Sequence, residues 1–458
     1  MANGGEDVGR AARVLYPDGV VVDSAPGSDA ANVDHTRSLM LDAGVPAIFY
    51  AAFSGDVVHA RVDILARENA TWRVIEVKSA TAPKPHHRED AAFQAFVIAS
   101  AGVSVGDVDV VHVNKSYIRG TDGIDWGQFF VRSPIFIDAD SEFPEIQKRV
   151  ATMRAVLQCQ TPPEIDPGPH CDQPRPCEFK TRCLASKPAD WVGFLPRLTA
   201  RQAEELRTQG IESITAVPAD FALSIQQARI RDALAAGQGF VAADLASRLN
   251  GFGPPACYLD FEAMAPAIPL YPGTSPYQQL PFQWSMHVMH ADGRLEHKEF
   301  LADGATDPSR PFAEALLAAA EKNEYPVLVY SAYEERCLKD IAQRFPDLAP
   351  KVNDLIGRLR DLLPVVRNGV YLREFRFSNS IKYVAPALSK GFSYEAIGSI
   401  KDGIAAANAF MAIASGAVTD SATIAANRRD LLAYCKHDTQ AMVEVHGALS
   451  RLISRGGT

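Results

Sequence analysis

The chain has 458 residues, of which 47% are hydrophobic and 22% charged, and its net charge is −9. At ~100–200 residues per domain, this length predicts two or three globular domains. The acidic balance excludes a general basic field, so any nucleic-acid binding must come from local patches or bound cations. The N-terminal residues show no signal-peptide pattern, and no apolar run approaches the ~18 residues of a membrane span. We therefore expect a cytoplasmic protein with no membrane partner, whose seven cysteines are thiols or metal ligands.

Two stretches rich in Val and Ile, 61–65 and 72–79, alternate apolar and polar side chains and predict two strands. Between them, Asn69 lies at the centre of an expected tight turn. A hairpin folded there places Asp63 opposite Glu76. Carboxylates in such positions lie about 5 Å apart and repel each other, and a divalent cation, which takes several oxygen ligands, would stabilise the pair. The hairpin therefore predicts a metal site.

Asp63 followed by Glu76-Val-Lys78 resembles the D…ExK core of the PD-(D/E)xK nucleases. Gln94 lies in a helix expected over 90–101 and resembles the Gln that follows this core in the RecB-like branch. The resemblance implies a restriction-endonuclease-like α/β domain in which these four residues are catalytic, with Asp63 and Glu76 holding Mg²⁺ or Mn²⁺. The alternative is a surface hairpin with a solvated Glu and Lys. Further helices are expected at 9–15 and 34–41, and further strands at 48–53, 57–65 and 108–113.

Four cysteines, Cys159, Cys171, Cys177 and Cys183, lie in a stretch that is rich in proline and poor in apolar residues. Such a stretch cannot build a core, and thiolate–metal bonds would order it. Their spacing fits either zinc or a [4Fe–4S] cluster, and unliganded cysteines are the alternative.

A cysteine triplet after a D…ExK core resembles the iron–sulfur RecB-like exonucleases, which implies a [4Fe–4S] cluster, with zinc as the alternative. In those enzymes the first cluster Cys precedes the nuclease core, whereas this chain has no Cys before Cys159. Either Cys159 supplies the fourth thiolate, or the cluster is incomplete, or the start codon lies inside the first domain.

Two helices are expected at 195–207 and 224–236, around a Gly-Ile turn at 210–214. This pattern resembles half of a helix-hairpin-helix, whose backbone N–H groups contact phosphates, and a plain helical spacer is the alternative. The Pro/Gly-rich segment 250–255 breaks the pattern and predicts a boundary. We therefore predict three parts: a domain over 1–188, a helical connector over 189–250, and a second domain over 251–458.

The second domain begins with a predicted strand at 256–262 that carries Asp260 and Glu262 on one face. In the last expected helix, at 428–452, Tyr434 and Asp438 lie one turn apart on an apolar stripe. A buried carboxylate at Asp438 is costly without a cation or a donor. Further strands are expected at 282–290, 295–301 and 326–330, and further helices at 311–322 and from 331.

Asp260-Phe-Glu262, Glu334 and Tyr434-x-x-x-Asp438 resemble the DEDD exonucleases of the RNase H-like superfamily, in the subgroup that contains Tyr. The region from 258 to 439 closely resembles the domain of unknown function designated family 2779, which commonly follows a RecB-like domain. The resemblance implies an RNase H-like fold and two-metal hydrolysis, with the four acids as ligands of Mg²⁺ or Mn²⁺ and Tyr434 orienting the water. The chain departs from the DEDD pattern at Glu334, where Asp is usual.

Together these patterns predict a metal-dependent nuclease or exonuclease that hydrolyses phosphodiester bonds of DNA or RNA, with one active site in each domain. The alternative is a nucleic-acid-binding or regulatory module with degenerate nuclease sites. A third interpretation is a metal-stabilised scaffold with no role in nucleic-acid chemistry.

Overall fold

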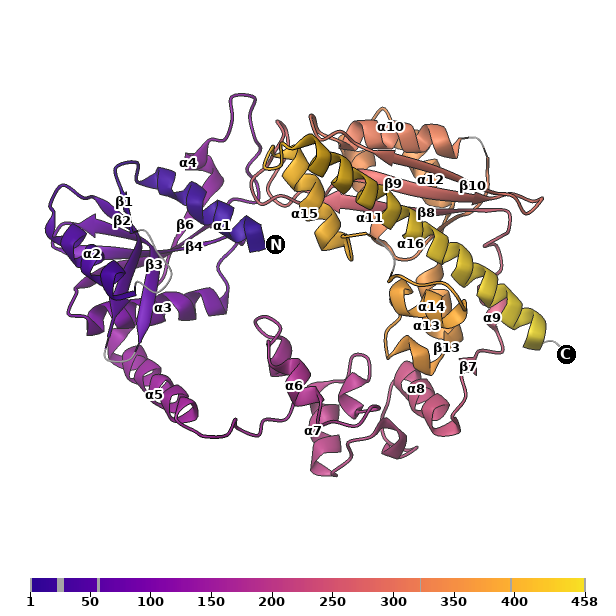
Figure 1. The fold of residues 1–458 in the computed structure, drawn as a ribbon, viewed down its shortest axis with the longest axis horizontal. Coiled ribbons are helices and arrows are strands. Elements are labelled where there is room, and N and C mark those ends of the chain that lie inside the picture. The colour runs from indigo at the N-terminus through magenta and orange to yellow at the C-terminus, as the bar shows by residue number, and fades with distance from the viewer. Residues whose placement is uncertain (1, 23–28, 56–57, 322, 396–397, 457–458) are drawn as a thin grey trace. The chain divides into compact units, whose positions relative to one another are not determined.

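A computed structural model describes residues 2–22, 29–55, 58–321, 323–395 and 398–456 (Figure 1). The chain has a mixed α/β architecture and divides into two compact units. Unit 1 contains Met1–Glu164 and Ala265–Gln278, and unit 2 contains Ile165–Met264 and Gln279–Thr458. Within the described ranges, no helix has both the length and the apolar character needed to cross a membrane.

Unit 1 is built on a six-stranded mixed sheet in the order β1-β2-β3-β4-β5-β6. The β1–β2 and β4–β5 pairs are parallel and the other neighbours are antiparallel. The strands are β1 (Val20–Val21), β2 (Ala47–Ser54), β3 (His59–Glu68), β4 (Thr71–Lys78), β5 (Val105–Val113) and β6 (Phe130–Pro134). The helices are α1 (Ala2–Ala11), α2 (Asp29–Leu41), α3 (Pro85–Ser100), α4 (Trp126–Phe129) and α5 (Ala139–Leu157). Side chains of α2 and α3 pack on one face of the sheet, and those of α1 and α4 pack on the other.

The predicted hairpin is confirmed as β3–β4. Its turn lies at Asn69, which adopts a left-handed φ of 50°, and Ile64 pairs with Ile75 as the expected register requires. The strand expected at 57–65 begins at His59, and Val57 lies outside the described residues. Helix α5 and strand β6 have no counterpart among the elements expected from the sequence.

Unit 2 contains a five-stranded sheet in the order β10-β9-β8-β11-β12 and a two-stranded sheet of β7 and β13. In the larger sheet β8, β11 and β12 are parallel, while β9 runs antiparallel to both of its neighbours. The strands are β7 (Phe240–Val241), β8 (Ala256–Met264), β9 (Leu280–Met289), β10 (Leu295–Leu301), β11 (Val327–Val329), β12 (Leu359–Asp361) and β13 (Val370–Tyr371). The helices are α6 (Lys180–Leu184), α7 (Ala200–Thr208), α8 (Ile225–Ala236), α9 (Leu245–Arg248), α10 (Ser309–Ala320), α11 (Tyr333–Arg344), α12 (Ala349–Gly357), α13 (Leu362–Gly369), α14 (Ile381–Leu388), α15 (Gly403–Ala414) and α16 (Ser421–Gly456).

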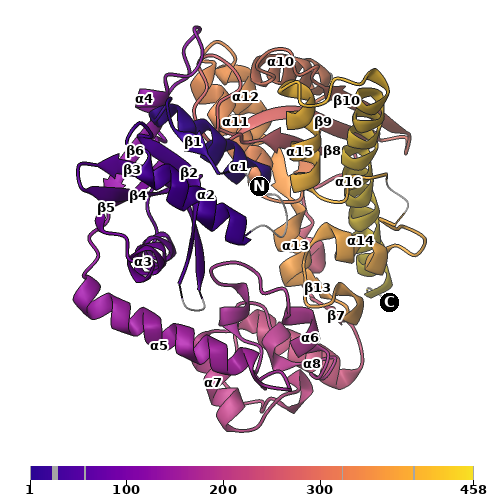
Figure 2. The ribbon, with the colours of Figure 1, turned by 60° about the vertical axis from the view of Figure 1, so that its left-hand side comes forward.

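The larger sheet of unit 2 has different helices on its two faces, and β8 shows the division. Cys257, Leu259 and Phe261 point into a core that includes side chains of α10, α11 and α12. Ala256 and Tyr258 point the other way, into a core shared with the long helix α16. Helix α16 lies across β8 and β9 (Figures 1 and 2). Because side chains alternate along a strand, any polar residue at an even position of β8 faces α16.

The segment predicted as a separate connector packs into unit 2. Leu206, Ile214 and Ile230 are buried in the same apolar cluster as Tyr258 and Met442. The structure therefore groups residues 189–250 with the C-terminal sheet, whereas the sequence predicted a domain boundary between them at 250. It also groups Ala265–Gln278 with unit 1, where Arg119 Nη1 donates a 2.7 Å hydrogen bond to the Pro269 carbonyl oxygen. Local sequence patterns do not reveal such long-range packing.

This shared core predicts that the connector unfolds together with the rest of unit 2. Ile214→Ala should lower the free energy of unfolding of unit 2 by about 2–5 kcal/mol, because it removes buried methylene groups and leaves a cavity. Ile225→Ala is the matched control, since Ile225 is 82% exposed, and it should change that energy by less than about 0.5 kcal/mol. Urea denaturation followed by circular dichroism measures both. A separate early transition in Ile214→Ala, with the main transition unchanged, would show an independent connector.

Candidate metal centre

Three carboxylates of unit 2 meet between β8 and α16. Asp260 and Glu262 are two residues apart on β8, so both point toward α16, and Asp438 points back from that helix. Each of the three offers an oxygen atom, and these atoms all lie within 4.8 Å of one another. No other group of three or more possible metal ligands at this spacing occurs among the described residues. The predicted convergence of these three acids is therefore present in the fold.

The cluster is electrostatically strained without a cation. At 4.8 Å and an effective dielectric constant of ~20, each pair of charged carboxylates repels by about 3.5 kcal/mol. The three pairs together reach roughly 10 kcal/mol, which is comparable with the whole net stability of a folded domain. Burial, and then repulsion from Asp438, raises the pKa of Glu262 to about 8 and the pKa of Asp260 well above its usual range. Divalent cations relieve this kind of repulsion by binding carboxylate oxygens.

Two phenols and a lysine border Asp438. The Tyr394 hydroxyl donates a 2.7 Å hydrogen bond to Asp438 Oδ1, and the Tyr434 hydroxyl also hydrogen-bonds this carboxylate. Burial raises the pKa of Asp438, while the Tyr394 hydrogen bond and the Lys382 charge oppose that rise. Lys382 Nζ lies 5.1 Å from the centre of the Tyr434 ring and attracts both Glu262 and Asp438. Tyr434 thus lies where the sequence predicted, whereas Tyr394 was missed because nothing in its local pattern links it to Asp438.

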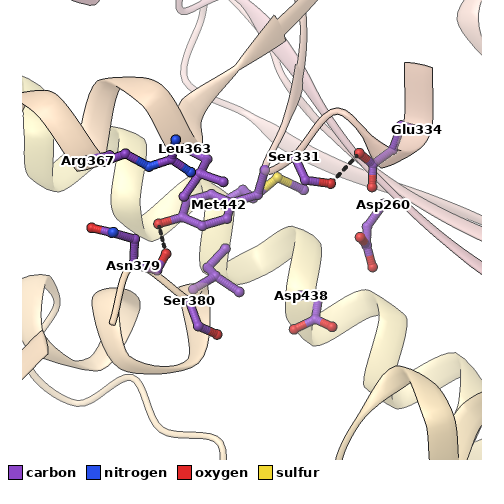
Figure 3. A pocket seen from close by; sticks show the side chains of 11 residues that line it. Asp260, Ser331, Glu334, Leu363, Arg367, Asn379, Ser380, Asp438 and Met442 are labelled. Atoms are coloured by element: carbon purple, nitrogen blue, oxygen red, sulfur yellow. Dashed lines mark hydrogen bonds between the residues drawn. The ribbon is translucent and has the colours of Figure 1, made fainter. Parts of the chain in front are cut away.

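Glu334 lies near the three acids but outside their 4.8 Å group. It occupies the first turn of α11, where the Ser331 hydroxyl donates a 3.3 Å hydrogen bond to Oε2. Burial raises the pKa of Glu334 to about 7, and its charge contributes to the raised pKa of Asp260. Figure 3 shows the carboxylates of Asp260, Glu334 and Asp438 along one side of a cavity of about 380 Å³.

A buried polar network fixes α16 against the sheet beside the cluster. Thr439 Oγ1 lies 2.8 Å from His287 Nδ1 and 2.9 Å from Ser285 Oγ, both on β9. Gln283 Nε2 donates a 2.8 Å hydrogen bond to the Leu431 carbonyl oxygen. Because Thr439 follows Asp438 directly, these contacts set the position of the Asp438 carboxylate relative to β8.

In unit 1 the four predicted site residues also come together. Gln94 Nε2 donates a 2.6 Å hydrogen bond to Glu76 Oε2, and Lys78 Nζ lies 2.6 Å from Glu76 Oε1. Asp63 Oδ2 accepts a 2.8 Å hydrogen bond from the Val77 backbone N–H. Burial, and then the Glu76 charge, raises the pKa of Asp63 to about 7.

The pairing of Asp63 with Glu76 differs in detail from the predicted one. The observed pairing of β3 with β4 ends at Ile64 and Ile75, so it does not reach Asp63. The Asp63 carboxylate instead accepts a hydrogen bond from the Val77 backbone N–H of the opposite strand. Lys78 is shared between Glu76 and Asp90, whose Oδ2 lies 2.7 Å from Nζ. Asp90 was missed because the helix that carries it follows β4 through a loop with no pattern of its own.

The four cysteines of the predicted cluster are divided between the two units. Cys159 belongs to unit 1, whereas Cys171, Cys177 and Cys183 belong to unit 2. Cys171 is buried, Cys183 is partly exposed and the other two are exposed. Within the described ranges, these thiols are not among the groups of three or more side chains that lie close enough to share a metal. The iron–sulfur and zinc assignments both stay predictions.

Comparison with known proteins finds a match for one part of the chain. Residues 257–380 match the family model described as domain of unknown function (DUF2779). The matched span includes Asp260, Glu262 and Glu334, while Tyr434 and Asp438 lie beyond it. No curated protein and no solved structure matches the chain.

The raised pKa values predict a pH-dependent response to metal. Between about pH 4.5 and about pH 8 the folded protein retains protons on this cluster that an unfolded chain has lost, so the stability of the metal-free protein falls as pH rises. A cation replaces those protons and therefore binds more tightly at higher pH. Differential scanning calorimetry should show a larger Mn²⁺-induced increase in Tm at pH 8 than at pH 6.

Two charge-matched variants accompany this experiment: one changes the cluster and the other is the control. Asp260→Asn should remove the Mn²⁺ effect and raise the metal-free Tm at pH 8. Asp354→Asn, at an exposed position away from the cluster, should behave as the wild type does. An Mn²⁺ effect that is independent of pH, or that persists in Asp260→Asn, would contradict the assignment.

Proposed function

We propose that the protein is a metal-dependent nuclease that hydrolyses phosphodiester bonds of nucleic acid at the Asp260, Glu262 and Asp438 cluster. The observation that carries the proposal is that oxygen atoms of these three carboxylates lie within 4.8 Å of one another, and that Asp260 and Asp438 line a cavity of about 380 Å³. A cluster of this kind is suited to Mg²⁺ or Mn²⁺, which also bind phosphate oxygens. When bound, such a cation supplies a Lewis acid for the phosphoryl group.

The chain's own residues have distinct roles in this proposal. Asp260, Glu262 and Asp438 hold the cation. Glu334, with its pKa near 7, exchanges a proton close to neutral pH and is suited to accept one from the attacking water. Tyr434 orients that water, and Tyr394 holds the Asp438 carboxylate through its 2.7 Å hydrogen bond. Lys382 attracts the same carboxylates and limits their repulsion.

Unit 1 provides a second proposed centre of the same reaction class. Asp63 and Glu76 are the candidate ligands of Mg²⁺ or Mn²⁺, Lys78 would hold a phosphate oxygen or the attacking water, and Gln94 positions Glu76. Their direct contacts support this proposal. A nucleic-acid-binding module with degenerate sites is the competing function, and a cleavage assay separates the two.

The assay incubates the purified full chain with end-labelled single- and double-stranded DNA and RNA in Mg²⁺ or Mn²⁺. In the Glu76→Gln background, Asp260→Asn should reduce cleavage by at least about 100-fold if the unit 2 centre acts, because the variant loses a ligand and a charge. Glu76→Gln in the Asp260→Asn background tests the unit 1 centre in the same way. Two substitutions at exposed acids, Asp354→Asn in unit 2 and Glu89→Gln in unit 1, should leave the rate unchanged.

The outcomes discriminate between the interpretations. Metal-dependent cleavage that both site variants leave intact would place the chemistry elsewhere in the chain. Binding without cleavage of any of the four substrates, with either cation, would favour the binding module and reject the enzyme.

A further inference from the structure

Arg367 lines the same cavity as the acidic cluster, at its opposite end. It lies in α13, and Figure 3 places it with Asn379 and Ser380 on the side away from Asp260 and Glu334. The residue is partly buried. Within the described residues, the Arg367 guanidinium makes no hydrogen bond and no ion pair, although carboxylates line the opposite end of the same cavity.

An unpaired, half-buried guanidinium needs an explanation, because arginines with reduced access to water are normally paired. A candidate partner is Asp361. Burial raises the pKa of this carboxyl, while the Leu363 N–H and then the Arg367 charge oppose that rise. However, Asp361 Oδ1 accepts the Leu363 N–H at 2.8 Å and caps α13. Asp361 therefore holds the helix that carries Arg367 and leaves the guanidinium available to a ligand.

The surroundings hold Arg367 in place. Its backbone carbonyl oxygen accepts a 3.0 Å hydrogen bond from Arg229 Nη1, and the Arg229 guanidinium lies over the Phe240 ring at 4.4 Å from its centre. Beside Arg367, the Asn379 carbonyl oxygen accepts a 3.0 Å hydrogen bond from the Tyr330 hydroxyl. The chain is thus fixed through its backbone at both places, and the polar side chains stay free to meet a ligand.

Asn379 and Ser380 complete a set of donors beside the guanidinium. Within the described part of the chain, the Asn379 amide and the Ser380 hydroxyl make no side-chain hydrogen bond, and both residues line the cavity. Arginine binds phosphate through a planar fork of N–H donors, and amide and hydroxyl groups add further hydrogen bonds. The chemistry of this end of the cavity is therefore that of an anion site.

We propose that Arg367, with Asn379 and Ser380, binds a phosphate group of the nucleic-acid strand next to the phosphodiester that the acidic cluster cleaves. The inference rests on the proposed function and assigns its strand-binding subsite. A volume of about 380 Å³ is at the lower end of the range for ligand pockets, ~300–1,000 Å³. The cavity therefore suits a short piece of a single strand, with one phosphate at the acidic end and its neighbour at Arg367.

The test measures the binding of a fluorescent single-stranded oligonucleotide by anisotropy, with Ca²⁺ in place of Mg²⁺, across a series of salt concentrations. Arg367→Gln should raise Kd about 10-fold and lower the slope of log K against log[salt] by about 0.7, the value for one lost phosphate contact on a single strand. Arg367→Lys should keep the slope and bind with intermediate affinity, because it retains the charge but loses the fork.

Arg373→Gln is the matched control, since Arg373 is exposed, belongs to the same unit and does not line the cavity. It should leave both Kd and the slope close to the wild-type values. If Arg367→Gln and Arg373→Gln have the same Kd and slope, the subsite is overturned. Melting temperatures of all variants identify any general loss of fold. If Arg367→Gln loses its fold, Arg367→Lys becomes the test variant. An unchanged Kd in Arg367→Lys would then also overturn the subsite.

Cleavage assays separate this inference from the proposed function. If the wild type cleaves and Arg367→Gln retains its KM and kcat, the nuclease stands and the subsite fails. If the wild type binds strands through Arg367 but cleaves none, the subsite stands and the nuclease fails. No binding of any strand by the wild type overturns both.

Discussion

The mutual repulsion of Asp260, Glu262 and Asp438 is the constraint on which the unit 2 site depends. Three carboxylates within 4.8 Å, mostly removed from water, cannot all be charged unless a cation or protons compensate them. The fold nevertheless holds them together, through the strand period of β8 and through the polar contacts that fix α16 at Thr439. This unfavourable arrangement is what supports the proposed divalent cation at the cluster.

The two candidate centres solve the same electrostatic problem differently. In unit 1, Lys78 lies 2.6 Å from Glu76 and Gln94 donates to the other oxygen, so the carboxylate is already compensated by the chain. In unit 2 the Lys382 ammonium acts on the acids only from a distance. We therefore infer that the unit 2 centre depends more strongly on metal, while the unit 1 centre retains its local geometry without one.

The sequence predicted the parts of the site that follow a regular period. Asp260 and Glu262 share a face because they are two residues apart on a strand, and Tyr434 and Asp438 share a face because they are one helical turn apart. The contribution of Tyr394 was not predictable in this way, since it lies 44 positions before Asp438 in the chain and no regular period relates the two residues. The same limit applies to Arg367 and to the packing of residues 189–250 into unit 2, because both depend on tertiary contacts. The cysteine cluster rested on resemblance and spacing and stays a prediction, because the described residues bring no three of these thiols within metal-sharing distance.

Anomalous diffraction from crystals grown with Mn²⁺ can show whether the unit 2 cluster binds metal, because it locates the cation without reference to activity. We expect an anomalous peak about 2.0–2.4 Å from carboxylate oxygens of Asp260, Glu262 and Asp438, and no such peak in crystals of Asp260→Asn. A fully occupied Mn²⁺ elsewhere in unit 2, with these three carboxylates bound only to protein groups or water, would contradict this expectation.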